Sequence, residues 1–277
     1  MVGCGWNAIV QVPAARWDVH AQPALPEPMA SRVRHAGFVR GAELADNAVF
    51  AVSPAEAAAM DPCQRLVLEH GYAALHDASM DRAALAGSLS GVFLGFAGFE
   101  FSQILAVSPA GRSVYAATGS ALSVASGRLS YALGLHGPCA SYDTACSAAL
   151  AACHSGLRSL QLRECTSVLT AGVNLMLLPG VGLSFATAGM TSVRGRCHTF
   201  DSRADGYGRG EGCHAAVLQP SGDGIKPAGL SLLGSCVRQD GKSASLTAPN
   251  GQAQQALLRA ALADGGVEPA ALSCYEA

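Results

Sequence analysis

The alternation of apolar and polar positions predicts a protein that contains both strands and helices. Three short apolar runs, "LSGVFLGF" (89–96), "TSVLTAGV" (166–173) and "GCHAAVLQP" (212–220), have the composition of buried strands. The run "SALSVASGRLSYALG" (120–134) has helical spacing instead and ends at a glycine. Its apolar positions fall on one helical face: Leu122, Ala125, Leu129 and Leu133. Strands and helices that alternate along the chain indicate a layered α/β fold.

Capping residues mark further helix starts. "SPAE" (53–56) and "DPCQ" (61–64) each combine an N-cap residue, a first-turn proline and an acid or amide that completes a capping box. Asn250 is expected to cap a helix over 251–266. "AQPALPEP" (21–28) predicts an irregular surface loop, and "SCYEA" (273–277) predicts the start of another strand.

Composition narrows the class of protein. The chain has 277 residues, of which 50% are hydrophobic, so it is long enough for one large domain or two halves. A net charge of -2 with scattered cations argues against nucleic-acid binding. The ten cysteines form no CxxC pair and no histidines have metal-ligand spacing, so no metal or bound cofactor is expected. A reducing compartment fits this cysteine usage.

One long uncharged run, Cys165 to Val193, has the length of a membrane span. It contains Asn174, Pro179 and several glycines, so a buried strand followed by a glycine-rich loop is the better interpretation. The first twenty residues lack the pattern of a secretory signal. A cytoplasmic location is therefore expected, with an organelle-targeting leader ahead of this sequence as the alternative.

Two apparent nucleotide-binding motifs do not satisfy their own spacing rules. Gly234 and Gly241 are separated by six residues where a phosphate-binding loop has four. In "GYGRGEG" (206–212), Glu211 stands where the dinucleotide fingerprint has glycine, and a strand is expected to follow instead of a helix. These glycines are expected to let the backbone approach another element closely.

The strongest candidate for chemistry is Cys146. It lies between an extended run, "PCASYDTA" (138–145), and an amphipathic run, "SAALAACHSGLRSLQLRE" (147–164). A thiol in the first turn of a helix faces unpaired backbone N–H groups and the positive end of the helix dipole, which both favour the thiolate. The alternative is that Cys146 is one more small buried hydrophobe. Position alone does not decide between these roles.

Five segments, taken with "DTACSAAL" (143–150), resemble the β-ketoacyl synthase (ketosynthase) domains of modular polyketide synthases and fatty-acid synthases. They occur in the family's order over nearly the whole chain: "VPAARWDV", "FAVSPAEAAAMDPCQRLVLE", "TGSALSVASGRLSYALGLHGP", "GMTSVRGRCHTFDSRADGYGRGEGC" and "LTAPNGQAQQALLRAAL". The resemblance implies a thiolase-like αβαβα fold, with the N-terminal half nearly complete and the C-terminal half only partial.

Residues 1–277 are accordingly expected to form one incomplete ketosynthase domain. The family's first strand precedes the "RWDV" region, and its first catalytic histidine follows a "VEA"-like strand, where this sequence ends with "SCYEA". The resemblance therefore implies that the first strand and the histidine-containing C-terminal part lie outside the sequence. His154 is eight residues beyond Cys146 on the same predicted helix and is too far away to bond to its sulfur. Asp143 and Thr144 are expected to shape the junction between strand and helix.

The resemblance also implies a reaction. Cys146 would accept an acyl group from the phosphopantetheine thiol of an acyl carrier protein, and its backbone N–H would serve as an oxyanion donor. A malonyl-type thioester would then lose carbon dioxide and attack the acyl group, giving a β-ketoacyl thioester. The expected partners are acyl and malonyl-type thioesters, the carrier protein, and a second copy of the chain or the other domains of a synthase. The alternative is a non-catalytic fragment that retains only dimerisation or carrier-protein contacts.

Overall fold

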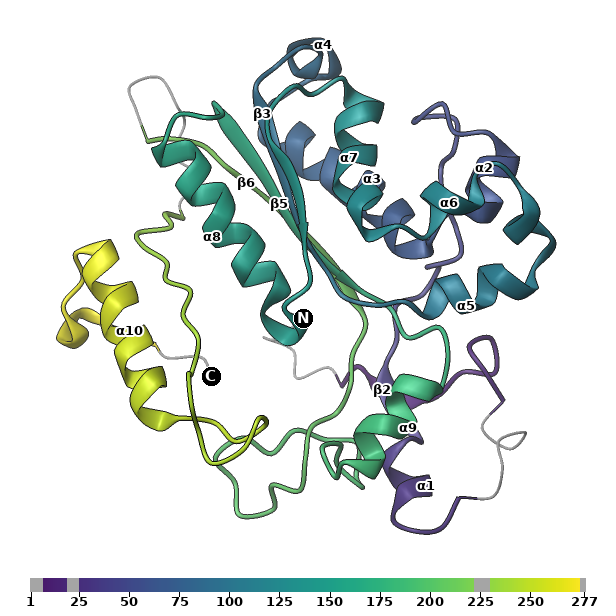
Figure 1. Ribbon diagram of the computed structural model, residues 1–277, viewed down its shortest axis with the longest axis vertical. Helices are drawn as coiled ribbons and strands as arrows, with labels where there is room; N and C mark the ends of the chain where they lie inside the picture. Colours follow the sequence, from purple (N-terminus) through teal and green to yellow (C-terminus); the bar gives the residue numbers. More distant parts are fainter. Residues whose placement is uncertain (1–6, 19–24, 222–229, 275–277) are drawn as a thin grey trace.

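The computed structural model describes residues 7–18, 25–221 and 230–274. Its central feature is a four-stranded sheet in the order β4-β3-β5-β6 (Figure 1). The strands are β3 (Ser90–Phe96), β4 (Cys139–Tyr142), β5 (Ser167–Asn174) and β6 (Gly212–Leu218). The first three are parallel, and β6 runs antiparallel to β5. The carboxyl ends of the three parallel strands therefore lie along one edge of the sheet.

Helices cover both faces of this sheet. On one face lie α3 (Pro62–Asp77) and α7 (Leu122–Leu133), and on the other lies α8 (Ala148–Gln161) (Figure 1). Strand β3 is buried along its whole length, and its side chains alternate between the two layers. Val92 packs with leucines of α3 and α7, whereas Phe93 packs with Ala152 of α8. This arrangement gives the α/β layering that the sequence predicts.

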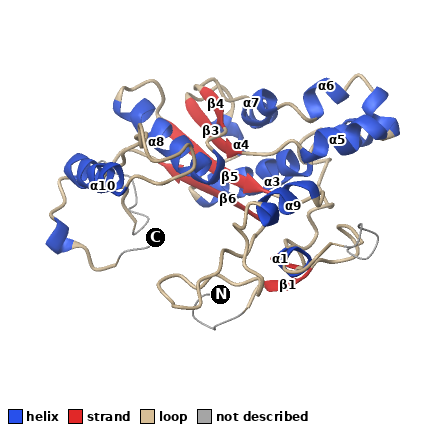
Figure 2. Ribbon diagram, turned by 60° about the horizontal axis from the view of Figure 1, so that its bottom comes forward, coloured by secondary structure: helices blue, strands red, loops and turns tan. Residues whose placement is uncertain are grey.

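A second group of elements lies beyond the carboxyl ends of the parallel strands. A short antiparallel pair, β1 (Ile9–Gln11) and β2 (His35–Gly37), stands apart from the main sheet (Figure 2). Helix α1 (Met29–Arg32) contacts α9 (Gly180–Thr187) close to this pair. The backbone amide of Gly37 donates to the carbonyl of Arg209, which joins the pair to the segment that leads into β6.

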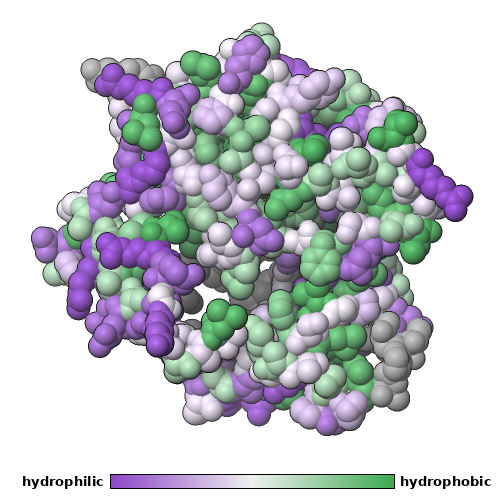
Figure 3. Space-filling model, viewed as in Figure 1, coloured by the Kyte–Doolittle hydropathy of each residue, from purple (hydrophilic) through white to green (hydrophobic). Residues whose placement is uncertain are grey.

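The remaining helices occupy the periphery. They are α2 (Pro54–Ala59), α4 (Arg82–Leu85), α5 (Glu100–Val107), α6 (Ala116–Gly119) and α10 (Gly251–Gly265). Helix α10 lies outside α8 and has no buried residue. In Figure 3 many hydrophilic residues lie over α10, and others lie elsewhere on the same face. An ion pair at 2.7 Å between Arg158 of α8 and Asp264 connects the two helices.

Most of the predicted elements are confirmed. The three apolar runs are strands β3, β5 and β6, and the run over 120–134 is α7, closed by Gly134 in the left-handed conformation. Ser53 and Asp61 accept backbone hydrogen bonds at the starts of α2 and α3, and Asn250 does so at the start of α10. The described part of the 21–28 loop, residues 25–28, has no strand or helix.

Two expectations need correction or lie partly outside the described residues. The stretch after β5 is not only a glycine-rich loop, because α9 forms within it and packs against α1. Among the described residues, no helix combines the length and the apolar character that a membrane crossing requires. Ser273 and Cys274 are not in a strand, and the rest of "SCYEA", residues 275–277, lies outside the described part.

Candidate active site

Cys146 lies at the connection between β4 and α8. The sequence predicts it in the first turn of the helix, but the structure places it in a separate 3-10 turn, Ala145–Ser147, that leads directly into α8. Its side chain is exposed at the carboxyl end of β4. Crevices outside the carboxyl ends of parallel strands are the usual ligand sites of open α/β sheets. The thiol is therefore accessible in the region where such folds bind substrates.

The backbone around Cys146 is held in a strained turn. Ala145 has a φ of 52°, in the left-handed region that residues with a side chain rarely adopt. Asp143 Oδ1 accepts a hydrogen bond from the Ala145 amide at 3.1 Å, and the Ser147 hydroxyl donates to the Thr144 carbonyl at 2.9 Å. These contacts support the expectation that Asp143 and Thr144 shape the junction. A left-handed alanine costs about 1–3 kcal/mol, which the surrounding contacts must offset.

Two glycines let α8 begin directly on the sheet. Gly95 of β3 and Gly172 of β5 are paired across the strands. A Cβ at Gly95 would lie 2.3 Å from the Ala149 amide nitrogen, and one at Gly172 would lie 2.7 Å from the Ala149 Cβ. The first turn of α8 thus packs directly against the backbone of two glycines that have no side chain. This close approach of α8 to the sheet fixes the position of Cys146 relative to the carboxyl ends of the strands.

The immediate surroundings of Cys146 can stabilise negative charge. Its backbone amide donates no hydrogen bond within the part of the chain that the structure describes. The N-terminus of α8 begins two residues further on. Burial raises the pKa of Tyr207, and the charge of the Cys146 thiolate raises it further, so the phenol lies within electrostatic range of the sulfur. Tyr207 was not predicted from the sequence, because it is 61 positions away from Cys146 along the chain.

A buried network of hydrogen bonds and an ion pair around Glu211 was also not predicted from the sequence. The side chain of Glu211 is completely buried and pairs with Arg16, whose Nη2 lies 2.8 Å from Oε2. The same carboxylate accepts hydrogen bonds from the amides of Val39 and Met176. Glu211 therefore joins the N-terminal segment, the β2 region and the segment after β5 at the start of β6. The glutamate that breaks the dinucleotide pattern is thus a structural anchor.

The glycines of "GYGRGEG" behave as expected only in part. A Cβ at Gly206 would lie 2.5 Å from the backbone of Thr191, and one at Gly208 would lie 2.9 Å from the carbonyl oxygen of Gly195. Gly210 and Gly212 have open space instead. Strand β6 follows the motif, so the expected order of loop and strand is confirmed. The segment between Gly234 and Gly241 is not followed directly by a helix, as a phosphate-binding loop would be.

None of the described histidines forms a hydrogen bond to Cys146. His154 lies on α8, as expected, and its Nδ1 is 2.8 Å from the hydroxyl of Ser235. It therefore helps to join α8 to the segment before α10. Among the described residues, no group of histidine, cysteine, aspartate or glutamate is arranged to hold a metal ion. The chemistry that this part of the chain offers is that of a thiol beside backbone donors.

Comparison with known proteins identifies the class to which this arrangement belongs. The family model for the β-ketoacyl synthase N-terminal domain matches residues 4–223, and the model for the C-terminal domain matches residues 230–277. The chain belongs to the β-ketoacyl synthase family, whose members are acyltransferases of the condensing type. This confirms the resemblance stated from the sequence.

The relatives include large polyketide synthases. The chain is 40% identical to a phenolphthiocerol/phthiocerol polyketide synthase protein of Mycobacterium tuberculosis, over 99% of the chain and 18% of that protein. It is 41% identical to polyketide synthase GfsB of Streptomyces halstedii, over 99% of the chain and 5% of that protein. The chain thus spans a small part of the length of these relatives.

Solved structures agree on the fold. The ketosynthase from module 6 of the bacillaene synthase of Bacillus subtilis 168 matches with a TM-score of 0.83 and 32% identity, over 95% of this chain and 44% of that one. A ketosynthase domain of the oxazolomycin synthase of Streptomyces albus JA3453 matches with a TM-score of 0.85 and 30% identity, over 97% and 48%. The fold is therefore the thiolase-like α/β fold of ketosynthase domains.

Proposed function

We propose that this chain supplies the acyl-accepting thiol of a condensing enzyme in polyketide or fatty-acid synthesis. Cys146 attacks an acyl thioester carried on the phosphopantetheine of an acyl carrier protein, and the carrier thiol leaves with a proton as the acyl-cysteine forms. The family membership and the exposed position of Cys146 at the strand ends support this role. No observation favours a fragment that only binds partners.

The second half-reaction is proposed on family membership alone. A malonyl-type thioester loses carbon dioxide, and the electron pair that remains on its α-carbon attacks the acyl carbonyl. The carbon–sulfur bond to Cys146 breaks, the thiolate is released, and a β-ketoacyl thioester stays on the carrier protein. Within this proposal the Cys146 N–H is one donor to the tetrahedral oxyanion. This role is supported by its having no acceptor among the described residues.

We also propose that the chain acts as a homodimer or within a multidomain synthase. Strand β4 is at one end of the sheet order, so one of its edges pairs with no other strand of the described residues and could pair with a strand of a second copy. Both helices that contact β4 carry a large exposed apolar residue, Tyr131 on α7 (90% exposed) and Leu150 on α8 (74% exposed). Such a surface suits an interface with a second copy.

The role of Cys146 is tested by competition among the cysteines. We expect a chloroacetamide or a cerulenin-like electrophile to modify Cys146 before any other cysteine, with the sites located by peptide mapping in a mass spectrometer. Cys197 is the control, since it is also exposed and lies outside β4 and its proposed interface. Labelling of the two at equal rates in protein shown to be folded by circular dichroism would remove the case for an activated nucleophile.

A further inference from the structure

The structure contains a cavity of about 690 Å³ that does not include Cys146 among its lining residues. It lies between the β1–β2 pair, α1, α9 and the segment over 191–209. We refer to it as the hairpin cavity. Its volume falls within the range of about 300–1,000 Å³ that is typical of small-molecule sites. Tyr207 lines the cavity and also lies within electrostatic range of Cys146, so the two regions are neighbours.

The polar side of the hairpin cavity is positively charged. Arg32, Arg34 and Arg209 supply the charge, the imidazole of His35 lies among them, and none of the described lining residues is acidic. The guanidinium of Arg32 donates to backbone carbonyls, including that of Thr191, and these neutral acceptors leave its charge in place. Among the described residues, the Arg34 guanidinium forms one ion pair, at 4.0 Å, with the exposed carboxylate of Glu27. A pair at that distance on the surface gives little compensation.

Arg209 differs from Arg32 and Arg34, because acidic groups that do not line the cavity interact with its charge. Burial lowers the pKa of its guanidinium, and the charges of Glu100, Tyr207 and Glu211 counteract that effect. Its guanidinium carbon also stands 5.3 Å from the centre of the Phe185 ring. The uncompensated charge of the cavity is therefore concentrated at Arg32 and Arg34.

Two buried polar atoms of the lining lack a partner among the described residues. They are the hydroxyl oxygen of Thr191, a residue only 3% exposed, and Nδ1 of His35. A buried polar group without a hydrogen bond is costly, and a native structure normally satisfies it with water, an ion or a ligand. Burial lowers the pKa of His35, and the positive charges of Arg196 and Arg34 lower it further. The electrostatic potential at His35 is thus positive.

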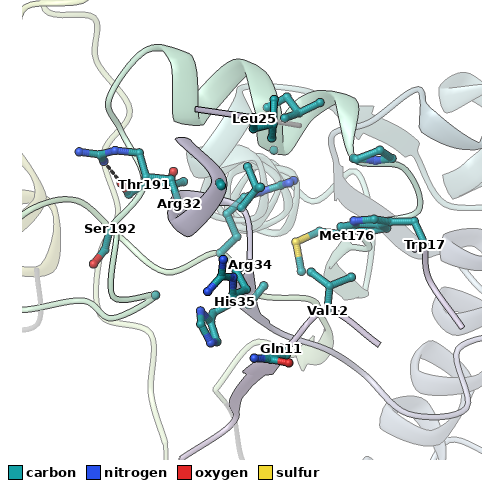
Figure 4. A pocket seen from close by; sticks show the side chains of 18 of the residues that line it. Gln11, Val12, Trp17, Leu25, Arg32, Arg34, His35, Met176, Thr191 and Ser192 are labelled. Carbon is teal, nitrogen blue, oxygen red and sulfur yellow. Dashed lines mark hydrogen bonds between the residues drawn. The ribbon is translucent and has the colours of Figure 1, made fainter. Parts of the chain in front are cut away.

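The opposite side of the hairpin cavity is apolar. Trp17, Met176 and Val12 lie beside one another on it, whereas Arg34 and His35 lie side by side on the polar side (Figure 4). Leu25 and Leu183 add further apolar surface. A cavity with one cationic side and one apolar side is complementary to an amphiphile with an acidic head.

We propose that the hairpin cavity binds an organic anion, with its phosphate or carboxylate head at Arg34, His35 and Thr191 and its apolar part against Trp17 and Val12. Arginine provides charge-assisted hydrogen bonds to either head group. The Thr191 hydroxyl donates to the same head, which removes its unsatisfied state. Cys146 does not line this neighbouring site, and the proposed binding does not rest on the reaction proposed for Cys146.

Trp17 provides the signal for a binding test on the full chain. The sequence contains two tryptophans, so Trp6→Phe leaves Trp17 as the single emitter. We expect n-octyl phosphate and octanoate to change its fluorescence in a saturable manner at micromolar or lower protein concentration. Octanol should bind at least about tenfold more weakly because it has no charged acceptor for Arg34. Inorganic phosphate should also bind at least about tenfold more weakly because it buries no apolar chain against Trp17 and Val12. The ratio of the two amphiphiles distinguishes a phosphate site from a carboxylate site.

Variants connect that signal to the named residues. Arg34→Gln and Thr191→Val should each weaken n-octyl phosphate binding, Arg34→Gln by roughly tenfold or more. Arg40→Gln is the matched control, because Arg40 is exposed on the same segment and does not line the cavity. Equal binding of octanol and n-octyl phosphate, equal binding of inorganic phosphate, or unchanged affinity in Arg34→Gln with an unchanged melting temperature would each overturn the proposal.

Discussion

Gly95→Ala tests how the sheet positions Cys146. The new methyl group would lie 2.3 Å from the Ala149 amide nitrogen and 2.5 Å from the carbonyl carbon of Ala148, and both neighbours are backbone atoms. Ordinary contacts between such atoms are about 3.5–4.0 Å, so the start of α8 must move outward by roughly 1 Å or more. No side-chain rotation can relieve the clash. The change therefore shifts the turn that carries Cys146.

The displacement should affect both the stability of the chain and the reactivity of Cys146. Overpacking of this kind costs about 1–3 kcal/mol in the free energy of unfolding. A displacement of about 1 Å in a catalytic group can lower its rate about 10²-fold. We therefore expect Gly95→Ala to have a lower urea midpoint and a much slower reaction of Cys146 with a chloroacetamide, as measured by peptide mapping.

Gly127→Ala is the matched control for this prediction. Gly127 lies inside α7, and a Cβ there would meet no atom within 4 Å. This substitution should raise stability by about 0.5–1 kcal/mol through helix propensity and leave Cys146 reactivity unchanged. If Gly95→Ala had the stability and the Cys146 reaction rate of the unaltered chain, the claim that Gly95 sets the position of the thiol would be refuted.

Three further predictions concern the rest of the chain. Arg16→Ala leaves the carboxylate of Glu211 buried without its charge partner and should lower the free energy of unfolding by about 3–5 kcal/mol. Arg203→Ala removes only an exposed ion pair and should have a far smaller effect. Equal urea midpoints for the two variants would contradict this prediction. Burial raises the pKa of Cys213 to about 12 from an ordinary value of 9.0, so the neutral thiol stabilises the fold below pH 9 and this stability is lost as the pH rises towards 12. Urea unfolding between pH 8 and pH 11 should therefore show a shallower alkaline loss in Cys213→Ala, and parallel profiles would count against the assignment. Several large apolar side chains between residues 230 and 272 are exposed, and that of Leu246 is fully exposed. Sedimentation should therefore detect association at micromolar concentration, and a strictly monomeric chain would contradict this.

Local sequence patterns predicted the elements that depend on local physics. Ser53, Asp61 and Asn250 satisfy backbone amides within three residues, so their roles are visible in a short window of sequence. The runs that became β3 and β5 are buried on both faces, which makes them almost continuously apolar. The position of Cys146 at the end of β4 follows from the same kind of pattern.

Features that join distant segments could not be predicted in this way. The pairing of Gly95 with Gly172 depends on the strand order, which no single segment encodes. The contact between Arg16 and Glu211 spans 195 positions, and in the sequence Glu211 is visible only as the residue that breaks a motif. Helix α9 contains two glycines and forms where it packs against α1, so tertiary contacts outweigh its local preference for a loop.

The most direct test of the account is acyl transfer to Cys146. The chain is incubated with an acyl thioester of a phosphopantetheine-bearing carrier protein, and the adduct is located by intact-mass measurement followed by peptide mapping. We expect one acyl group per chain on the peptide that contains Cys146, and no adduct in Cys146→Ala, while Cys139→Ala behaves as the unaltered chain does. An acyl group on another residue, or the same adduct yield in folded Cys146→Ala, would contradict the account.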